Sequence, residues 1–394
     1  MRKLSKKTET FTDSIIRRMT RIAIEHGAVN LSQGFPDFNP PKAILDRLSE
    51  VAHTGPHQYA ITWGAPNFRA ALAKKFEHFT GHAVDPETEI VTVCGSTEAM
   101  MTAMMTVTNP GDKVIIFSPF YENYGADTIL CGADPIYVPL IPPDFHFDPD
   151  VLEAAFKQNP AALVLCNPSN PAGKVFTEEE LKIIADLAVK YDTFVLTDEV
   201  YEHIVYKPYR HNYIANIPGM WERTLACNSL SKTYSITGWR LGYVTSSPEV
   251  IDVARKVHDF LTVGAAAPLM EAVIPGLEFP DSYYEELLAT YTGKKELFLN
   301  GLDRLGIAHT DPHAAYYVML DISEYGYEDD VEFCYKLAEH VGVAAVPGSS
   351  FFKEPVNHLV RLHFAKTDET LYDALDKLEN IKKMHDVKNS PWRL

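Results

Sequence analysis

Short apolar runs alternate with longer amphipathic stretches through the middle of the chain. The longer stretches, such as residues 96–108, 177–191 and 248–261, repeat apolar residues with helical spacing, whereas the short runs are rich in Val, Ile and Leu. Continuous apolar strands between helices are typical of a largely parallel sheet covered on both faces. The pattern therefore predicts an α/β fold with strands at residues 90–95, 113–119, 135–140, 162–168, 194–199, 224–230 and 241–247.

The pattern changes in the last third of the chain. A charged helical stretch at residues 283–306 leads into short apolar runs and a last helix at residues 367–384, which predicts a small α+β domain. A single hydrophobic core stops growing at roughly 250–300 residues, and this chain has 394. We therefore expect a large domain at residues 46–285 and a second unit formed by residues 1–45 and 286–394.

Composition narrows the range of partners and compartments. The 53 acidic residues outnumber the 36 basic ones, and the net charge of -17 disfavours nucleic acid and anionic membrane surfaces as partners. The basic start of the chain is followed by no apolar run, so it predicts an arm or a first helix, not a signal peptide or membrane span. The five cysteines form no Cys-x-x-Cys pair, and the histidines show no metal-ligand spacing. We expect reduced thiols, a cytoplasmic protein and no metal site.

Residues 229–244, SLSKTYSITGWRLGYV, carry the strongest chemical signal. Lys232 follows Ser229 and Ser231, and Arg240 comes eight residues later, after a Gly-Trp pair. A neutral lysine amine attacks aldehydes, while the planar fork of an arginine and nearby hydroxyl groups fit phosphate oxygens. The segment favours a phosphorylated aldehyde as ligand; the alternative is an exposed lysine beside a turn.

Other polar residues follow the predicted strands, where ligands gather in parallel sheets. Asp198 ends an apolar run, and its carboxylate can either keep a pyridine nitrogen protonated or cap a following helix. Ser96 and Thr97 stand at a strand-to-helix junction, which suits an anion site or a capping box. The segment at residues 167–173, NPSNPAG, is by itself typical of a turn.

Together, residues 229–244 and 167–173 closely resemble the class I/II aminotransferases, with Ala172 in place of the usual threonine of the second motif. These are fold-type I enzymes that use pyridoxal 5'-phosphate (PLP). The resemblance implies a fold-type I PLP-dependent transferase, with a mostly parallel central sheet in a large domain plus a small α+β domain. It also implies that Lys232 forms the Schiff base with the cofactor.

The resemblance assigns roles to further residues. Lys232, Asp198 and Tyr201 are the implied catalytic residues, and Asp198 keeps the cofactor's ring nitrogen protonated. Arg361 binds the substrate α-carboxylate with the backbone N–H of Gly34, and Asn170 contacts both substrate and cofactor. The implied cofactor-binding residues are Ser96, Thr97, Tyr121, Asn170, Asp198, Tyr201, Ser229, Lys232 and Arg240, together with Tyr59 supplied by a second subunit. A homodimer with shared active sites follows from that last assignment.

Substrate preference is the least determined feature. Thr97 stands where many prokaryotic aspartate aminotransferases carry a lysine, and residues 57–64, 316–323 and 360–366 look closer to the kynurenine, glutamine and methionine aminotransferase branch. We expect amino-group transfer from an aromatic, unbranched or sulfur-containing L-amino acid to a 2-oxo acid by a ping-pong mechanism. Trp63, Tyr59, Phe35 and Tyr124 are candidates for an aromatic wall.

Three alternatives stay open at this point. A PLP-dependent carbon–sulfur β-lyase keeps the same lysine, aspartate and arginine, and an aspartate aminotransferase differs mainly in its substrate pocket. A regulator of aminotransferase fold that only binds the cofactor is the third, but such proteins carry a fused basic DNA-binding segment, and this chain has none.

Overall fold

The computed structural model describes residues 5–9 and 13–387. Part of the predicted N-terminal arm, residues 1–4 and 10–12, lies outside the described residues, and a first helix, α1 (Ile15–His26), follows it. The five cysteines are free. Among the described helices, none is long and apolar enough to cross a bilayer.

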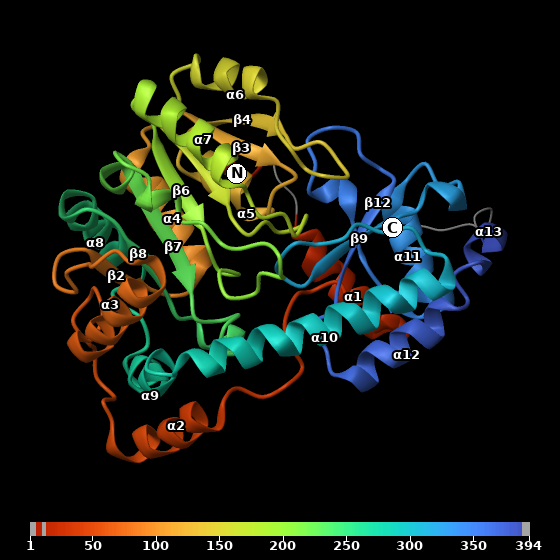
Figure 1. The fold of residues 1–394 in the computed structure, drawn as a ribbon, viewed down its shortest axis with the longest axis horizontal. Coiled ribbons are helices and arrows are strands. Elements are labelled where there is room, and N and C mark those ends of the chain that lie inside the picture. Colours follow the sequence, from red (N-terminus) through yellow and green to blue (C-terminus); the bar gives the residue numbers. More distant parts are fainter. Residues whose placement is uncertain (1–4, 10–12, 388–394) are drawn as a thin grey trace, which may run out of the picture.

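All seven predicted apolar runs form strands of one sheet (Figure 1). In the order in which they pair, the strands are β2 (Ile90–Val93), β8 (Gly242–Thr245), β7 (Thr224–Ser229), β6 (Phe194–Asp198), β5 (Ala162–Cys166), β3 (Lys113–Ser118) and β4 (Asp134–Pro139). The five strands from β7 to β4 run parallel to one another. The prediction of a largely parallel sheet is therefore confirmed.

Strand β8 departs from the parallel pattern, since it runs antiparallel to both β2 and β7. The connection from β7 to β8, residues 230–241, contains only the short turn η4 (Thr237–Trp239) and no helix that could cross the sheet. Parallel strands need a longer crossover, so this connection returns as a hairpin. Lys232 and Arg240 lie in that hairpin loop.

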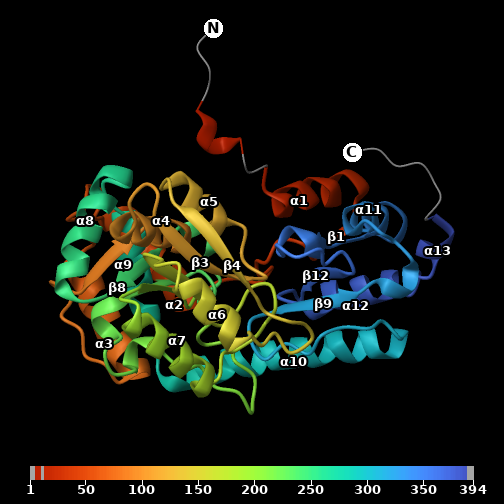
Figure 2. The same ribbon diagram turned by 90° about the horizontal axis from the view of Figure 1, so that it is seen from above.

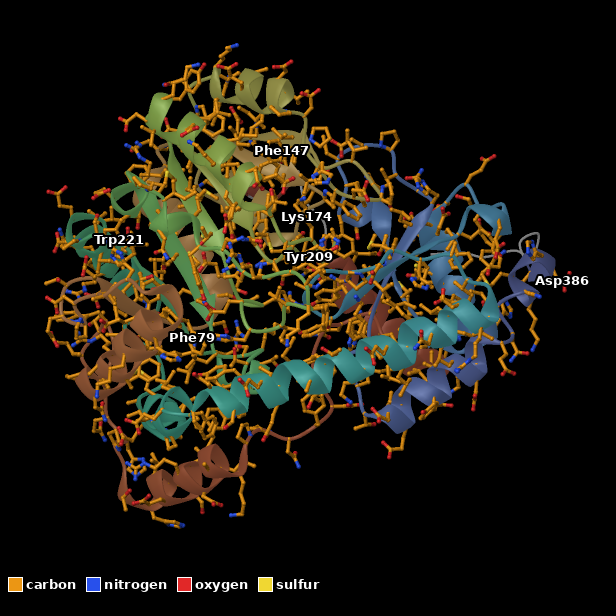
Figure 3. The ribbon with its side chains drawn as sticks, in the orientation of Figure 1. Phe79, Phe147, Lys174, Tyr209, Trp221 and Asp386 are labelled. Carbon is orange, nitrogen blue, oxygen red and sulfur yellow. The ribbon has the colours of Figure 1, made fainter. Side chains whose placement is uncertain are left out.

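The two faces of the sheet are buried by different helices, and alternate residues of each strand face opposite sides. Ile115, Leu163 and Val195 pack with helices α6 and α7, whereas Val114 and Leu196 pack with α4, α5 and α8. On the first side, Phe147 packs on the ring of Phe117 at 5.6 Å between centroids (Figure 3). The helices are α4 (Ser96–Val107), α5 (Asn123–Leu130), α6 (Pro149–Phe156), α7 (Glu178–Lys190) and α8 (Pro248–Thr262). Further helices at the β2 side are α2 (Lys42–Thr54), α3 (Pro66–Thr80) and α9 (Ala267–Leu277).

A second, smaller sheet lies at the other end of the molecule (Figures 1 and 2). Its strands pair in the order β11 (Val346–Pro347), β12 (Leu359–His363) and β9 (Tyr317–Asp321), all antiparallel. The helices of this part are α11 (Asp330–Lys336), which continues into a π-helical turn at Leu337–Val341, α12 (Asp368–Leu378) and α13 (Lys383–Val387). Helix α10 (Asp281–Leu305) runs from one part to the other. The division of the chain at residues 46 and 285 stays a prediction.

The N-terminal segment is attached to the small part and then enters the space between the two sheets. Strand β1 (Val29–Asn30) pairs with β10 (Val343–Ala344), and the backbone N–H of His363 donates to the carbonyl of Leu31 at 3.0 Å. This pairing places Gly34 close to β12 and its central residue, Arg361.

Candidate active site

A cavity of about 760 Å³ opens at the carboxyl ends of the parallel strands and reaches the small sheet. Ten of the twelve predicted site residues line it: Gly34, Ser96, Thr97, Tyr121, Asn170, Asp198, Tyr201, Lys232, Arg240 and Arg361. Ser229 and Tyr59 do not line it in this single chain. The strand ends therefore gather the sequence candidates as expected for an α/β sheet.

Lys232 lies at the centre of the cavity. Its Nζ donates to the carbonyl oxygen of Gly34 at 3.1 Å and is 5.8 Å from the ring centroids of Tyr201 and Tyr316. Burial lowers the pKa of Lys232 to about 8, the charge of Asp198 opposes this change, and the charges of Arg240 and Arg361 add to it. The neutral amine, which is the nucleophilic form, is therefore a larger share of Lys232 near neutral pH than it is of an ordinary lysine.

Asp198 ends β6 and is almost completely buried. Its Oδ2 accepts from the Tyr124 hydroxyl at 2.7 Å, and its Oδ1 accepts weakly from the backbone N–H of Val200 at 3.4 Å. Burial raises the pKa of this carboxyl, while Tyr124, Val200 and Lys232 oppose the rise. No helix begins after Asp198, because residues 199–203 form turns, so the helix-cap alternative is wrong.

Arg361 and Asn170 meet across the cavity although 191 positions separate them. Arg361 is 1% exposed; its Nη1 donates to Asn170 Oδ1 at 2.6 Å, and its Nη2 donates to the carbonyl of Ser32 at 2.8 Å. The Nε of Arg361 has no partner among the described residues. A buried guanidinium with an unused donor is suited to a carboxylate ligand.

Gly34 is required by the close approach of Tyr317. A Cβ atom added at Gly34 would collide with the hydroxyl of Tyr317, which in turn lies 2.9 Å from the Tyr201 hydroxyl. The carbonyl of Gly34 also accepts from the Tyr316 hydroxyl at 3.0 Å. Three tyrosines therefore fix the position of the N-terminal segment beside Lys232.

The turn before α4 faces Arg240. Gly95 has φ of +84°, and a Cβ atom there would lie 2.5 Å from Nη2 of Arg240. Ser96 and Thr97 are the first residues of α4, but no side-chain cap bond closes its N-terminus. The capping-box alternative is therefore wrong for these two hydroxyls, and the turn presents backbone N–H groups, hydroxyls and a guanidinium together.

Ser229, the serine predicted to bind the phosphate, does not line the cavity, whereas Ser231 does. The Ser229 hydroxyl donates within the protein, to Ser231 Oγ at 2.7 Å and to the Leu241 carbonyl at 3.1 Å. Ser231 lines the cavity instead. The assignment of Ser229 as a direct phosphate ligand stays a prediction, and Ser231 is the nearer hydroxyl in this structure.

The expected aromatic wall is only partly present. Phe35 and Tyr121 line the cavity, and burial raises the pKa of Tyr121. Tyr124 does not line it, because the residue is buried and bound to Asp198. Trp63 packs against Arg255, with 4.6 Å from its ring centroid to the guanidinium carbon. Tyr124 is therefore not part of such a wall, whereas Trp63 and Tyr59, which do not line the cavity of a single chain, stay predictions.

Several cavity residues escaped the sequence analysis. Cys166 lines the cavity without lying in a motif that singles it out, and Tyr317 also lines it, although the resemblance of residues 316–323 gave it no role in the site. Glu98 was not among the predicted site residues, yet it lines the cavity and pairs with His258 of α8 at 2.6 Å. The position of Glu98 two residues after Ser96 was the one local signal available, since carboxylates favour the first turn of a helix.

Comparison with known proteins agrees with this geometry. Residues 26–378 match the family described as aminotransferase class I and II. The structure superimposes on N-succinyldiaminopimelate aminotransferase from Mycobacterium tuberculosis with a TM-score of 0.92 and 35% identity, covering 96% of this chain and 99% of the other. A methionine aminotransferase from Escherichia coli is 33% identical over 369 residues, 93% of this chain and 96% of that protein. Kynurenine–oxoglutarate transaminase 3 from Mus musculus is 33% identical over 407 residues, 95% of this chain and 89% of that protein.

The match to the solved relative extends over nearly the whole of both chains. A family match of this length, together with relatives above 30% identity, shows both the fold and the enzyme class. This chain is a fold-type I aminotransferase and belongs to the class I and II aminotransferases.

Proposed function

We propose that this enzyme binds PLP at Lys232 and transfers the amino group of an aromatic, unbranched or sulfur-containing L-amino acid to a 2-oxo acid by a ping-pong mechanism. The observation that carries the proposal is the position of Lys232. Lys232, whose pKa is lowered, lies in one cavity with the buried carboxylate of Asp198. The same cavity contains the turn before α4, which Arg240 faces, and the buried Arg361.

The residues present fit a phosphorylated pyridine aldehyde. Arg240, Ser96 and Thr97 would hold the phosphate at the N-terminus of α4, where the lack of a Cβ atom at Gly95 lets the Arg240 guanidinium approach the turn. Asp198 would bind the protonated ring nitrogen, since its buried carboxylate has only a weak partner on Oδ1. Tyr201 and Asn170 would bind the phenolic oxygen, and Tyr121 would pack on the ring.

When bound, PLP supplies an electron-withdrawing ring that stabilises negative charge at the substrate's α-carbon. The side chains do the rest. Arg361 binds the α-carboxylate and so fixes the direction of the α-C–H bond. Lys232 Nζ would take the proton from the α-carbon as general base and then return a proton as general acid. Asp198 holds the positive charge on the ring nitrogen throughout.

Two observations support the substrate class. Thr97 provides no cation for a second carboxylate close to the phosphate turn, and Phe35 contributes an aromatic surface to the cavity. The relatives above are named for methionine, kynurenine and an acylated diaminopimelate. A panel should therefore pair methionine, kynurenine, glutamine, phenylalanine, aspartate and N-succinyldiaminopimelate with pyruvate, 2-oxoglutarate and oxaloacetate.

We expect the highest kcat/KM for an aromatic, unbranched or sulfur-containing donor. Aspartate as the best donor would overturn the substrate proposal but leave the aminotransferase. A cystathionine control separates the lyase alternative, because a β-lyase releases pyruvate in the absence of any 2-oxo acid, whereas this enzyme should release none beyond the background of a heated sample.

A homodimer in the cytoplasm belongs to the same proposal. Tyr59 is 88% exposed and Phe260 is 92% exposed, and Thr62 joins their two segments by a hydrogen bond to Asp259 at 3.3 Å. Exposed aromatic side chains next to the mouth of a cavity are suited to contact with a second copy, which would bring Tyr59 to the partner's phosphate site. Sedimentation of the holoenzyme tests this, and a monomer with full activity would contradict it.

Asp198→Asn should keep the fold and lose about 10²-fold in kcat, since removal of one preorganised charge partner at the reacting ring costs that order of rate. A neutral amide cannot hold the ring nitrogen protonated. Cofactor affinity should fall by less than kcat, because the phosphate contacts are untouched. Steady-state kinetics beside titration of the apoenzyme with PLP gives both numbers. Turnover at the wild-type rate would remove Asp198 from the catalytic machinery.

A further inference from the structure

His258 is a completely buried histidine of α8 that joins two segments at the edge of the active-site cavity. Its Nδ1 lies 2.6 Å from Oε1 of Glu98, in the first turn of α4, and its Nε2 lies 3.0 Å from the carbonyl oxygen of Thr62. Thr62 stands three residues after Tyr59. One ring therefore connects the turn of Ser96 and Thr97 with the segment that bears Tyr59.

The contacts with Glu98 and Thr62 determine the protonation of this ring. The Thr262 hydroxyl also lies 3.3 Å from Nδ1, but it donates to the nearer Oε1 of Glu98. A carbonyl oxygen only accepts, so Nε2 carries a hydrogen. Glu98 accepts the backbone N–H of Cys94 at Oε2 and the hydroxyl of Thr262 at Oε1, 3.0 Å away. A carboxyl group that accepts from several donors at a helix N-terminus is ionised, and it then also accepts from Nδ1. With hydrogens on both nitrogens, His258 is an imidazolium cation.

The pKa of Glu98 agrees with this arrangement. Burial raises it, but the hydrogen bond and charge of His258, with the donors at Cys94 and Thr262, bring it below its usual value. The ionised form of Glu98 is thus the one present at neutral pH.

The charges of Glu98 and His258 affect the turn of Ser96 and Thr97, here called the phosphate turn. Glu98 and a bound phosphate share the N-terminus of one helix, and two anions there repel each other. A cation between Glu98 and the Tyr59 segment offsets the carboxylate. We propose that His258 is a buried imidazolium that positions the phosphate turn and holds the Tyr59 segment against it, so that phosphate retention depends on its positive charge. This inference rests on the proposed function, since the anion it concerns is the phosphate of PLP.

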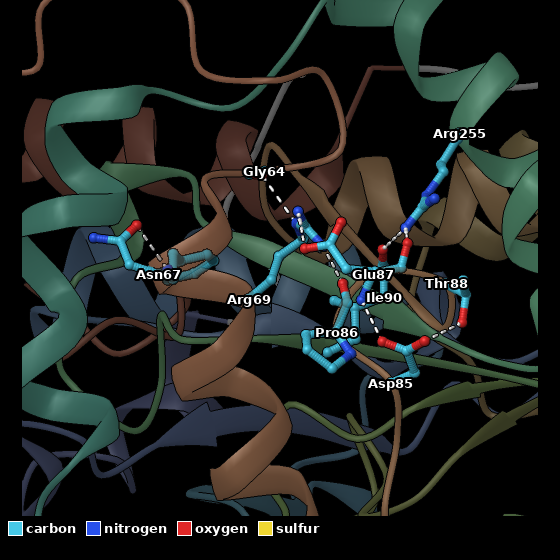
Figure 4. Close-up of polar contacts among 10 residues, drawn as sticks. Gly64, Asn67, Arg69, Asp85, Pro86, Glu87, Thr88, Ile90 and Arg255 are labelled. Carbon is cyan, nitrogen blue, oxygen red and sulfur yellow. Dashed lines mark hydrogen bonds and ion pairs between the residues drawn. The ribbon is translucent and has the colours of Figure 1, made fainter.

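Four further charged or titratable residues lie on the segments around His258. Asp259 and Arg255 lie on α8 itself, Cys94 precedes the turn, and Arg240 faces it from the hairpin loop. Arg255 is engaged elsewhere, since it donates to the carbonyls of Glu87 and Ile90 (Figure 4). Beside it, Arg69 donates to the carbonyl of Gly64 at 3.0 Å and so fixes the end of the Tyr59 segment (Figure 4).

Release of PLP from the holoenzyme tests the proposal. His258→Gln should release PLP about 10- to 100-fold faster than the wild type near neutral pH, because the buried carboxylate is left uncompensated beside the phosphate. His340→Gln, a change in the π-helical turn of the small part, is the matched control and should behave as wild type.

A double variant that removes both charges separates the effect of the uncompensated Glu98 carboxylate from the effect of lost packing. Glu98→Gln combined with His258→Gln should release PLP more slowly than His258→Gln alone, since no uncompensated charge is left. In the wild type, histidine ring nitrogen NMR should show one imidazolium that keeps both protons at neutral pH, and Glu98→Gln should make this ring neutral. These measurements also decide the matter if His258→Gln fails to fold.

Equal release rates for wild type and His258→Gln would overturn the inference, as would a neutral ring in the NMR spectrum. Failure of the proposed function is distinguishable, because it would appear in the wild type itself, as the absence of PLP bound at Lys232 after borohydride reduction.

Discussion

Lys232→Ala should lose at least about 10²- to 10⁴-fold in turnover, the range that a positioned general acid and base contributes. The loss should exceed that of every other variant, because the same side chain binds the cofactor and moves the proton at the α-carbon. Purified wild type should be yellow, and borohydride should attach the cofactor to the peptide that contains Lys232. Peptide mapping by mass spectrometry and steady-state rates give the two readouts.

Lys256→Ala provides the matched control, since Lys256 is a largely exposed lysine of α8 whose ion pair, among the residues that the structure describes, is with Asp252. It should stay yellow and active. A colourless wild-type protein, or a reduced cofactor found on another lysine, would contradict the assignment of Lys232.

The pKa of Lys232 sets a pH dependence for capture of the cofactor by the apoenzyme. Burial lowers that pKa to about 8, so the amine is mostly protonated below this pH and mostly neutral above it. Only the neutral amine attacks an aldehyde. The rate of colour development after addition of PLP should therefore rise with pH and level off above about 8. A rate that is constant over this range would mean that the amine does not titrate there.

Arg361→Ala should leave an enzyme that is yellow and dimeric but binds amino acids poorly. Truncating one partner of a buried charge pair costs on the order of 2–5 kcal/mol, which corresponds to a loss of tens to thousands of fold in kcat/KM. The partners that Arg361 leaves, Asn170 and the Ser32 carbonyl, belong to the substrate side of the cavity, whereas Lys232 and the α4 turn are unchanged. Substrate titration followed by the cofactor's absorbance measures the effect.

Arg361→Lys should rescue little, because an ammonium group cannot bind both carboxylate oxygens as the guanidinium does. Arg210→Ala is the control, since the Arg210 side chain is 74% exposed and, within the described part of the chain, forms its ion pair with Glu178. If Arg361→Ala loses PLP, or uses amino acids normally, then Arg361 is not the carboxylate ligand and the small sheet has another role.

The strands of the large sheet were predictable because they are local features. Each is an apolar run of a few residues bounded by turn residues, and the burial of both sheet faces makes such runs continuous in sequence. The direction of β8 was not predictable from its residues. The connection between β7 and β8 contains no crossover helix, and the pairing of the two strands in the folded sheet shows that β8 is antiparallel to β7.

The residues of the active site also divide into those that the sequence predicts and those that it does not. Lys232 and Arg240 stand eight residues apart in one hairpin loop, so their spacing was readable along the chain, and the strand ends marked Asp198 and Asn170. Tyr59 could be named only through the family resemblance, and its 88% exposure is a property of the folded chain.

Sequence by itself determined the α/β class, the seven strands, the lysine and arginine of the hairpin loop, and the family to which the motifs belong. The tertiary structure decided which distant residues meet. It joins Arg361 to Asn170, Tyr124 to Asp198 and His258 to Glu98, pairs separated by 191, 74 and 160 positions. Such contacts depend on strand order and helix packing, which sum many weak long-range interactions, so no local pattern records them.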